Sequence, residues 1–125
     1  MFVRYQSNKP GVDPVIHHLP GTANADYKVG DALYFSSNKL AKATGTNKPE
    51  YICAGEVSIP SGGAGTIPVV AVDPNTIYET TVNSGTVALG TKYTIHTDAA
   101  QITSTSTSGV AEVVGIDGAR IFVKF

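Results

Sequence analysis

Two adjacent histidines, His17 and His18, are the side chains in this chain best suited to bind a metal ion. The third histidine, His96, lies far along the sequence, and the single cysteine, Cys53, lies in the apolar run YICAG. A structural zinc site needs four ligands, and neighbouring side chains on an extended chain point to opposite sides. The sequence therefore predicts no metal site and no cofactor, and we interpret the histidine pair as polar residues of an N-terminal arm.

The segment PSGGAG, residues 60–65, suggests two further kinds of chemistry. Ser61 has the residue type of a hydrolase nucleophile, and the glycines resemble those of a phosphate-binding loop. However, Ser61 lacks the strand-turn-helix context of a nucleophile elbow, and no Lys-Ser or Lys-Thr pair follows the glycines. Without a lysine or the amides of a helix N-terminus, an anion has little to hold it. We expect this segment to be a mobile hairpin loop.

The acidic residues are spread along predicted turns and strands, at Asp73, Glu79, Asp98, Glu112 and Asp117. Their spacing does not match a calcium-binding loop. Folding can still bring two carboxylates together for glycoside hydrolysis, but a β-sandwich of this length rarely provides a cleft. We therefore expect a protein that is not an enzyme.

The composition limits the partners of the chain. Its 125 residues carry a net charge of -1, and only 15% of them are charged, well below the roughly 25% of typical soluble proteins. Because no cluster of Lys and Arg interleaves with aromatic residues, nucleic acid is not an expected partner. No apolar run approaches a signal-peptide core or a membrane span, so we expect synthesis in the cytoplasm and no membrane contact. A lone cysteine in an apolar run predicts a buried, reduced thiol.

The elements that must position these residues are short strands. Alternation of apolar and polar residues, bounded by Gly, Asp and Asn, is strongest in residues 90–125, and Asp117-Gly118 is the strongest hairpin signal. Residues 30–44 predict a second hairpin, with a short helix over 38–44 as the alternative. We expect an all-β fold, a compact antiparallel β-sandwich or small β-barrel of about eight short strands.

Two residues predict local irregularities within these strands. Gly55 interrupts a long strand over residues 51–59, where a bulge or a close approach of another segment is expected. Residues 66–72 form the most continuously apolar stretch and are expected in the core. Because proline cannot donate a ladder hydrogen bond, Pro68 calls for a sheet edge, a bulge or the start of the strand.

The expected organisation is an extended N-terminal arm, residues 1–20, followed by a β-rich body, residues 21–125. Three of the seven prolines fall in the arm, and proline restricts pairing, so we expect the arm to be largely unpaired within its own fold. The arm also contains apolar residues that need cover from the body or from a partner, namely Phe2, Val3, Tyr5, Val15, Ile16 and Leu19.

Several motifs in residues 30–125 occur in an order that resembles the small capsid-associated proteins of tailed bacteriophages. These are the decoration, or cement, proteins that sit on the outside of the head and stabilise it, some of which carry head fibres. The motifs are GDALY (30–34), AGEV (54–57), IPVVAV (67–72), IYET (77–80), GTKYTIHTD (90–98), TSGVAEVV (107–114), IDG (116–118) and VKF (123–125).

The resemblance implies a structural virion protein with a β-rich body, often a homotrimer, that binds the major capsid protein where capsid subunits meet. Some members of this class also have an N-terminal arm that becomes ordered on the shell, and residues 1–20 are the expected counterpart. Removal of residues 2–16 is then expected to abolish shell binding while the body stays folded. The residues expected to contact the capsid are Phe2, Arg4, Tyr5, His17 and His18.

A recognition module, such as a carbohydrate-binding or fibre-base domain, is the alternative function. It would use exposed Tyr27, Tyr34 or Tyr78 as stacking platforms. The chain has no Trp, and only 8% of its residues are aromatic, which is a thin supply for sugar stacking once a core is filled.

Overall fold

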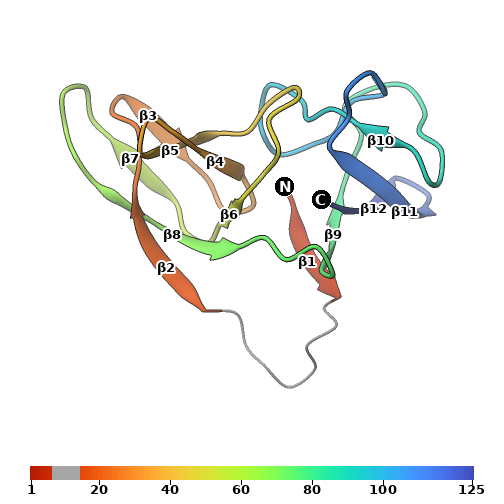
Figure 1. The fold of residues 1–125 in the computed structure, drawn as a ribbon, viewed down its shortest axis with the longest axis horizontal. Coiled ribbons are helices and arrows are strands. Elements are labelled where there is room, and N and C mark those ends of the chain that lie inside the picture. Colours follow the sequence, from red (N-terminus) through yellow and green to blue (C-terminus); the bar gives the residue numbers. More distant parts are fainter. Residues whose placement is uncertain (7–14) are drawn as a thin grey trace.

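The computed structural model describes residues 1–6 and 15–125 of the chain. Its twelve strands pair antiparallel, in two five-stranded sheets and one two-stranded sheet, and these residues contain no helix (Figure 1). The predicted fold class is confirmed: the protein is compact, all-β and antiparallel, consistent with a β-sandwich. The strands outnumber the expected eight because several of them are only two to four residues long.

One five-stranded sheet joins the two ends of the chain. Val3 lies opposite Glu79 and Arg4 opposite Tyr78, so the first strand pairs with the ninth. The sheet then continues through the last strand of the chain. In spatial order its strands are β1 (Val3–Gln6), β9 (Ile77–Thr80), β12 (Arg120–Lys124), β11 (Ala111–Asp117) and β10 (Lys92–Tyr93).

The second five-stranded sheet curls until its outer strands meet. In spatial order its strands are β2 (Ile16–Pro20), β8 (Thr66–Ala71), β6 (Tyr51–Cys53), β4 (Ala32–Ser36) and β5 (Lys39–Lys42). Gly21 bridges to Leu40, and the Thr22 N–H donates to the Leu40 carbonyl oxygen over 3.2 Å. A two-stranded sheet of β3 (Ala25–Tyr27) and β7 (Val57–Ile59) lies beside this five-stranded sheet. We call these two sheets together the curled lobe, and the sheet that contains β1 and β12 the other lobe.

The hairpins predicted at Asp117-Gly118 and over residues 30–44 are present. The hairpin expected at residues 60–65 is wrong, because this segment joins β7 to β8, which lie in different sheets. Strands β11 and β12 are joined by a two-residue loop whose first residue, Gly118, has φ 61°. This positive φ belongs to Gly at the first central position, which is the type II′ pattern. Strands β4 and β5 are joined through Ser37 and Asn38, with φ 53° and 65°, as in a type I′ turn. The alternative helix over residues 38–44 is therefore wrong.

Gly55 marks a break rather than a bulge. The expected strand over 51–59 divides into β6 and β7, which belong to different sheets. A Cβ atom on Gly55 would lie 2.7 Å from Cγ of Pro68, so the expected close approach is present. Pro68 lies in β8, which is an internal strand and not an edge strand. Proline is tolerated there because the pairing of β6 with β8 ends at Val69, so that Pro68 is opposite a strand residue only on the β2 side.

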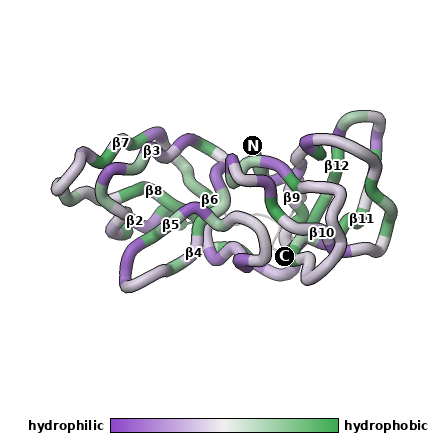
Figure 2. The backbone as a smooth tube through the Cα atoms, turned by 90° about the horizontal axis from the view of Figure 1, so that it is seen from above, coloured by the Kyte–Doolittle hydropathy of each residue, from purple (hydrophilic) through white to green (hydrophobic). Residues whose placement is uncertain are grey.

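Two clusters of buried side chains form the core. One fills the curled lobe and includes Tyr27, Leu33, Leu40 and Ile67. The other takes side chains from both five-stranded sheets and is thereby shared by the two lobes; it includes Phe2, Ala32, Ile52, Tyr78 and Val123. Figure 2 shows the two lobes side by side.

The predicted N-terminal arm is extended, but its described residues are not unpaired. Strand β1 pairs with β9, and strand β2 pairs with β8 over five residues. The expectation that this segment is largely unpaired is therefore wrong for these strands, because burying the Phe2 ring, which is 1% exposed, requires its strand to join the sheet. Of the three prolines on which the expectation rested, Pro20 lies in β2, and Pro10 and Pro14 lie outside the described residues.

Candidate functional site

A groove of about 680 Å³ runs between the two lobes. Strands β1 and β9 line it from one lobe, and β2, β6 and β8 from the other, together with the connection from β8 to β9. Its volume falls within the roughly 300–1,000 Å³ of typical ligand sites.

The rim of the groove is apolar and open to solvent. Met1, Val3, Val15 and Val29 are 54%, 46%, 66% and 47% exposed, and all four line the groove. They are four of the ten large apolar side chains that are exposed among the described residues. Scattered exposed apolar side chains are ordinary, but a group around one hollow is typical of an interaction site.

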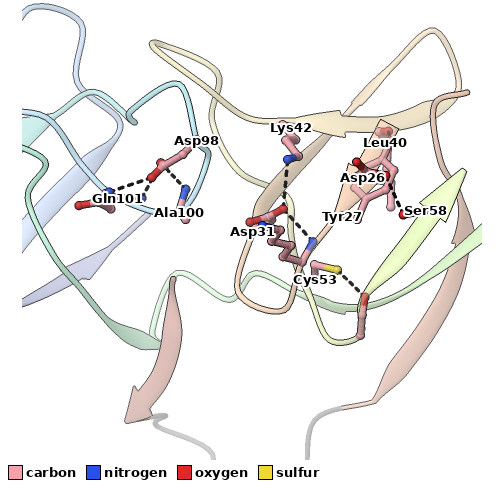
Figure 3. A network of polar contacts seen from close by, with 12 residues as sticks. Asp26, Tyr27, Asp31, Leu40, Lys42, Cys53, Ser58, Asp98, Ala100 and Gln101 are labelled. Carbon is pink, nitrogen blue, oxygen red and sulfur yellow. Dashed lines mark hydrogen bonds and ion pairs between the residues drawn. The ribbon is translucent and has the colours of Figure 1, made fainter. Parts of the chain in front are cut away.

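The floor of the groove contains two buried ionisable groups, the Cys53 thiol and the Tyr78 hydroxyl. The Cys53 thiol donates to the Gly55 carbonyl oxygen over 3.0 Å (Figure 3). Burial raises the pKa of this thiol, although the bond to Gly55 opposes the change. Burial likewise raises the pKa of Tyr78, against the effect of a hydrogen bond to the backbone of Asp73. Neither group is poised as a nucleophile or base near neutral pH, because both keep their protons.

Arg4 supplies a positive charge to the groove. Its side chain is exposed, and no carboxylate of residues 1–6 or 15–125 forms an ion pair with it. Asp73, an acidic residue on the same groove, accepts a hydrogen bond from the Asn75 N–H over 2.8 Å. The groove therefore contains the guanidinium of Arg4 and the carboxylate of Asp73 among mostly apolar residues.

The structure brings three of the five predicted contact residues together. Phe2, Arg4 and His17 all line the groove: Arg4 lies in β1, His17 in β2 of the other sheet, and Phe2 directly precedes β1. Phe2 is buried, so it anchors the strand in the core and is not the exposed contact residue that we expected. Tyr5 and His18 are exposed but are not among the groove residues.

Tyr5 belongs to a cluster that the sequence did not predict. Its ring centroid lies 4.6 Å from that of Phe122, and the Arg120 guanidinium lies 5.2 Å from the Phe122 ring centroid and 5.9 Å from that of Tyr5. Glu79 Oε1 holds this guanidinium at 2.7 Å from Nη2. The alternation in ARIFVKF places Arg120 and Phe122 on one face, but only the pairing of β1 with β9 brings Tyr5 to them.

The other polar contacts near the junction of the lobes hold loops in place (Figure 3). Asp31 accepts the Lys28 N–H over 2.9 Å, and Lys42 Nζ lies 3.5 Å from its Oδ2. Asp98 accepts hydrogen bonds from the backbone N–H of Ala100 and from the side chain of Gln101. Within the described residues, no buried side-chain N or O atom lacks a partner, and no group of His, Cys, Asp and Glu could hold a metal ion.

The tyrosines of the alternative function do not form a platform. Tyr27 and Tyr78 are 1% and 3% exposed, and Tyr34 is half-buried. The Tyr27 hydroxyl donates to the Leu40 carbonyl oxygen over 2.8 Å, so it stabilises the core of the curled lobe. The expectation that these rings are exposed stacking platforms is wrong for Tyr27 and Tyr78.

No helix in the described part of the chain is long and apolar enough to span a membrane. Comparison of the sequence with models of protein families, with curated proteins and with solved structures finds no match.

Proposed function

We propose that the chain is a structural protein of a tailed-phage virion, which binds the major capsid protein on the outer surface of the head and stabilises the expanded shell. The observation that carries the proposal is the apolar-rimmed groove, whose exposed Met1, Val3, Val15 and Val29 need a protein surface to cover them. The order of motifs in residues 30–125, which resembles decoration proteins, supplies the partner.

In this proposal the protein acts by adhesion and needs no catalytic group or cofactor. A subunit that binds the expanded shell, and not the unexpanded one, stabilises the expanded state by mass action. At a free concentration 100 times the Kd, each occupied site adds about 2.7 kcal/mol. The protein would thus make heads more resistant to heat.

The proposed assembly on the shell is a homotrimer. The cluster of Tyr5, Arg120 and Phe122 supports this part, because aromatic and arginine side chains are enriched among residues that dominate binding energy. The cluster is separate from the groove, so one surface is available for neighbouring copies while the other faces the capsid. Trimerisation multiplies weak contacts through effective concentration. Sedimentation as a monomer, together with random placement on heads, would exclude this assembly.

The test of the proposal is co-sedimentation of the full chain with expanded, undecorated heads. We expect saturation at a fixed ratio to capsid subunits and a higher temperature of head disruption. Val29→Asp is expected to lose binding, because it places a charge on the groove rim. Leu89→Asp is the matched control: Leu89 is 63% exposed but does not line the groove, so this variant is expected to bind as the unaltered chain does.

Failure of the unaltered chain to bind heads would overturn the proposal, as would undiminished binding by Val29→Asp. Removal of residues 2–16 is not a clean test. It deletes strand β1 and the buried Phe2, so lost binding would not be separable from loss of the shared core. The earlier expectation that the body stays folded after this deletion conflicts with that packing.

A further inference from the structure

The groove is bordered by a strand with a free edge. Among residues 1–6 and 15–125, strand β1 is the outermost strand of its sheet and pairs only with β9. Figure 1 shows β1 on the side of its sheet that is nearer the curled lobe. Met1, Val3 and Val15 line the groove between the two lobes. An unpaired strand edge presents backbone N–H and C=O groups to which another extended segment can hydrogen-bond. The groove is therefore suited to an extended peptide rather than to a helix.

The side chains around this edge define the chemistry of such a peptide. Val3, Val15 and Val29 provide exposed apolar surface, and Arg4 provides a guanidinium with no ion-pair partner among residues 1–6 and 15–125. In contrast, the exposed Arg120 is already paired with Glu79 and Asp117. A ligand that covers Arg4 with apolar surface alone would desolvate its charge without compensation, whereas a carboxylate would pair with it.

We infer that the groove binds an extended segment of the partner protein that carries a carboxylate among β-branched apolar residues. The segment lies along the free edge of β1, its apolar side chains cover the valines of the rim, and its carboxylate pairs with Arg4. Strand β1 has four residues, so about four to six residues of the partner, roughly 13–20 Å in length, match this edge. The inference rests on the proposed function, because it names the part of the capsid subunit that the groove recognises.

The probe is the peptide acetyl-VEVTV-amide, with acetyl-VQVTV-amide as its uncharged counterpart. Each is titrated into the isotope-labelled full chain, and binding is followed by NMR shifts of backbone amides. We expect shifts at the groove, and about fivefold tighter binding of the Glu peptide at low salt, as for an ion pair of moderate strength. This difference is expected to shrink as salt is raised.

Arg4→Gln is the decisive variant, and Arg120→Gln is its matched control with the same loss of charge. We expect Arg4→Gln to bind the two peptides equally and Arg120→Gln to keep the preference for Glu. Equal affinities in the unaltered chain would overturn the inference, as would a preference that persists in Arg4→Gln or an absence of shifts at the groove.

The outcomes separate the inference from the proposed function. If the peptides behave as expected but the protein does not bind heads, the groove recognises acidic extended segments of a different partner protein and the proposed function fails. If heads are bound in a manner that depends on Val29, but the Glu and Gln peptides are equivalent, the proposed function stands and the inference fails.

Discussion

The backbone N–H of Phe2 donates to the carbonyl oxygen of Gly30 over 2.9 Å, which ties the first strand of one lobe to a turn of the other. The Phe2 ring packs edge-on against Phe125, with 5.4 Å between the ring centroids. The first and last aromatic residues of the chain are thus in contact within the shared core. These contacts attach the N-terminal segment to the rest of the fold.

Phe2→Ala is expected to lower the free energy of unfolding by about 3–5 kcal/mol, because it removes a buried ring and leaves a cavity. Val3→Ala, at the neighbouring and half-exposed position, is the control and is expected to cost less than about 1 kcal/mol. Urea unfolding followed by circular dichroism measures both. Similar values for the two variants would show that the first strand is not anchored by Phe2.

Gly109→Ala is expected to destabilise the fold by about 3 kcal/mol or more, because overpacking against backbone cannot be relieved by a rotamer change. A Cβ at this position would lie 2.3 Å from the carbonyl carbon and oxygen of Lys92. Gly62→Ala is the control, since its Cβ would meet nothing within 4 Å; its φ of 68° limits the expected cost to about 1 kcal/mol. Equal melting temperatures for these variants would contradict the packing of residue 109 on β10.

Asp98 is expected to make stability depend on pH in the acid range. Partial burial raises its pKa, but hydrogen bonds from the Gln101 side chain and from the Ala100 and Gln101 N–H groups together lower it by more. The pKa in the folded protein is therefore below the usual 3.8. As pH falls, the unfolded chain takes up its proton first. The stabilisation is therefore present above about pH 4–5 and is lost as pH falls through the folded pKa.

The measurement for Asp98 is the difference in melting temperature between the unaltered chain and Asp98→Asn, which cannot titrate. We expect a positive difference at pH 7 that decreases toward zero in acid. The other carboxylates change the melting temperature of both proteins with pH in the same way, so their effect cancels in the difference. A difference that does not change between pH 7 and pH 2 would show that the hydrogen bonds do not depend on the charge of Asp98.

The Cys53 thiol is expected to react much more slowly with a thiol reagent such as DTNB in the native protein than in urea. Burial raises its pKa, so at pH 8 less of it is thiolate than in the unfolded chain, whose value is near 9.0. The time course of absorbance at pH 8, with and without urea, measures this. A native rate equal to the unfolded rate would mean that the floor of the groove opens readily.

Local signals in the sequence predicted local structure well. Gly118 and the pair Ser37-Asn38 adopt positive φ at turns that join adjacent strands, and this preference is contained within a few residues. The close approach at Gly55 and the burial of Cys53 were also predicted, because a missing side chain and an apolar neighbourhood are visible in the sequence itself. The all-β class follows from the same alternation of residues.

The candidate site was predicted only in part. Arg4 and His17 were chosen as contact residues of a free arm, whereas they line a groove between two sheets. Val29 and the cluster around Arg120 were missed, because nothing near them in the sequence indicates which distant strand they face. The prediction that the arm is largely unpaired gave more weight to its prolines than to its apolar residues, which become buried only when the arm pairs with the body.

The sequence by itself determined the strands, the turns and the apolar residues that must be covered, since these depend on backbone preferences and on alternation over a few residues. Only the tertiary structure decided that β1 joins β9, some 70 residues away, that the second sheet curls onto itself, and that Val3, Val15 and Val29 surround one groove. Which distant strands pair depends on the total apolar area that the pairing buries. That quantity is a property of the whole chain and cannot be read from any one of its segments.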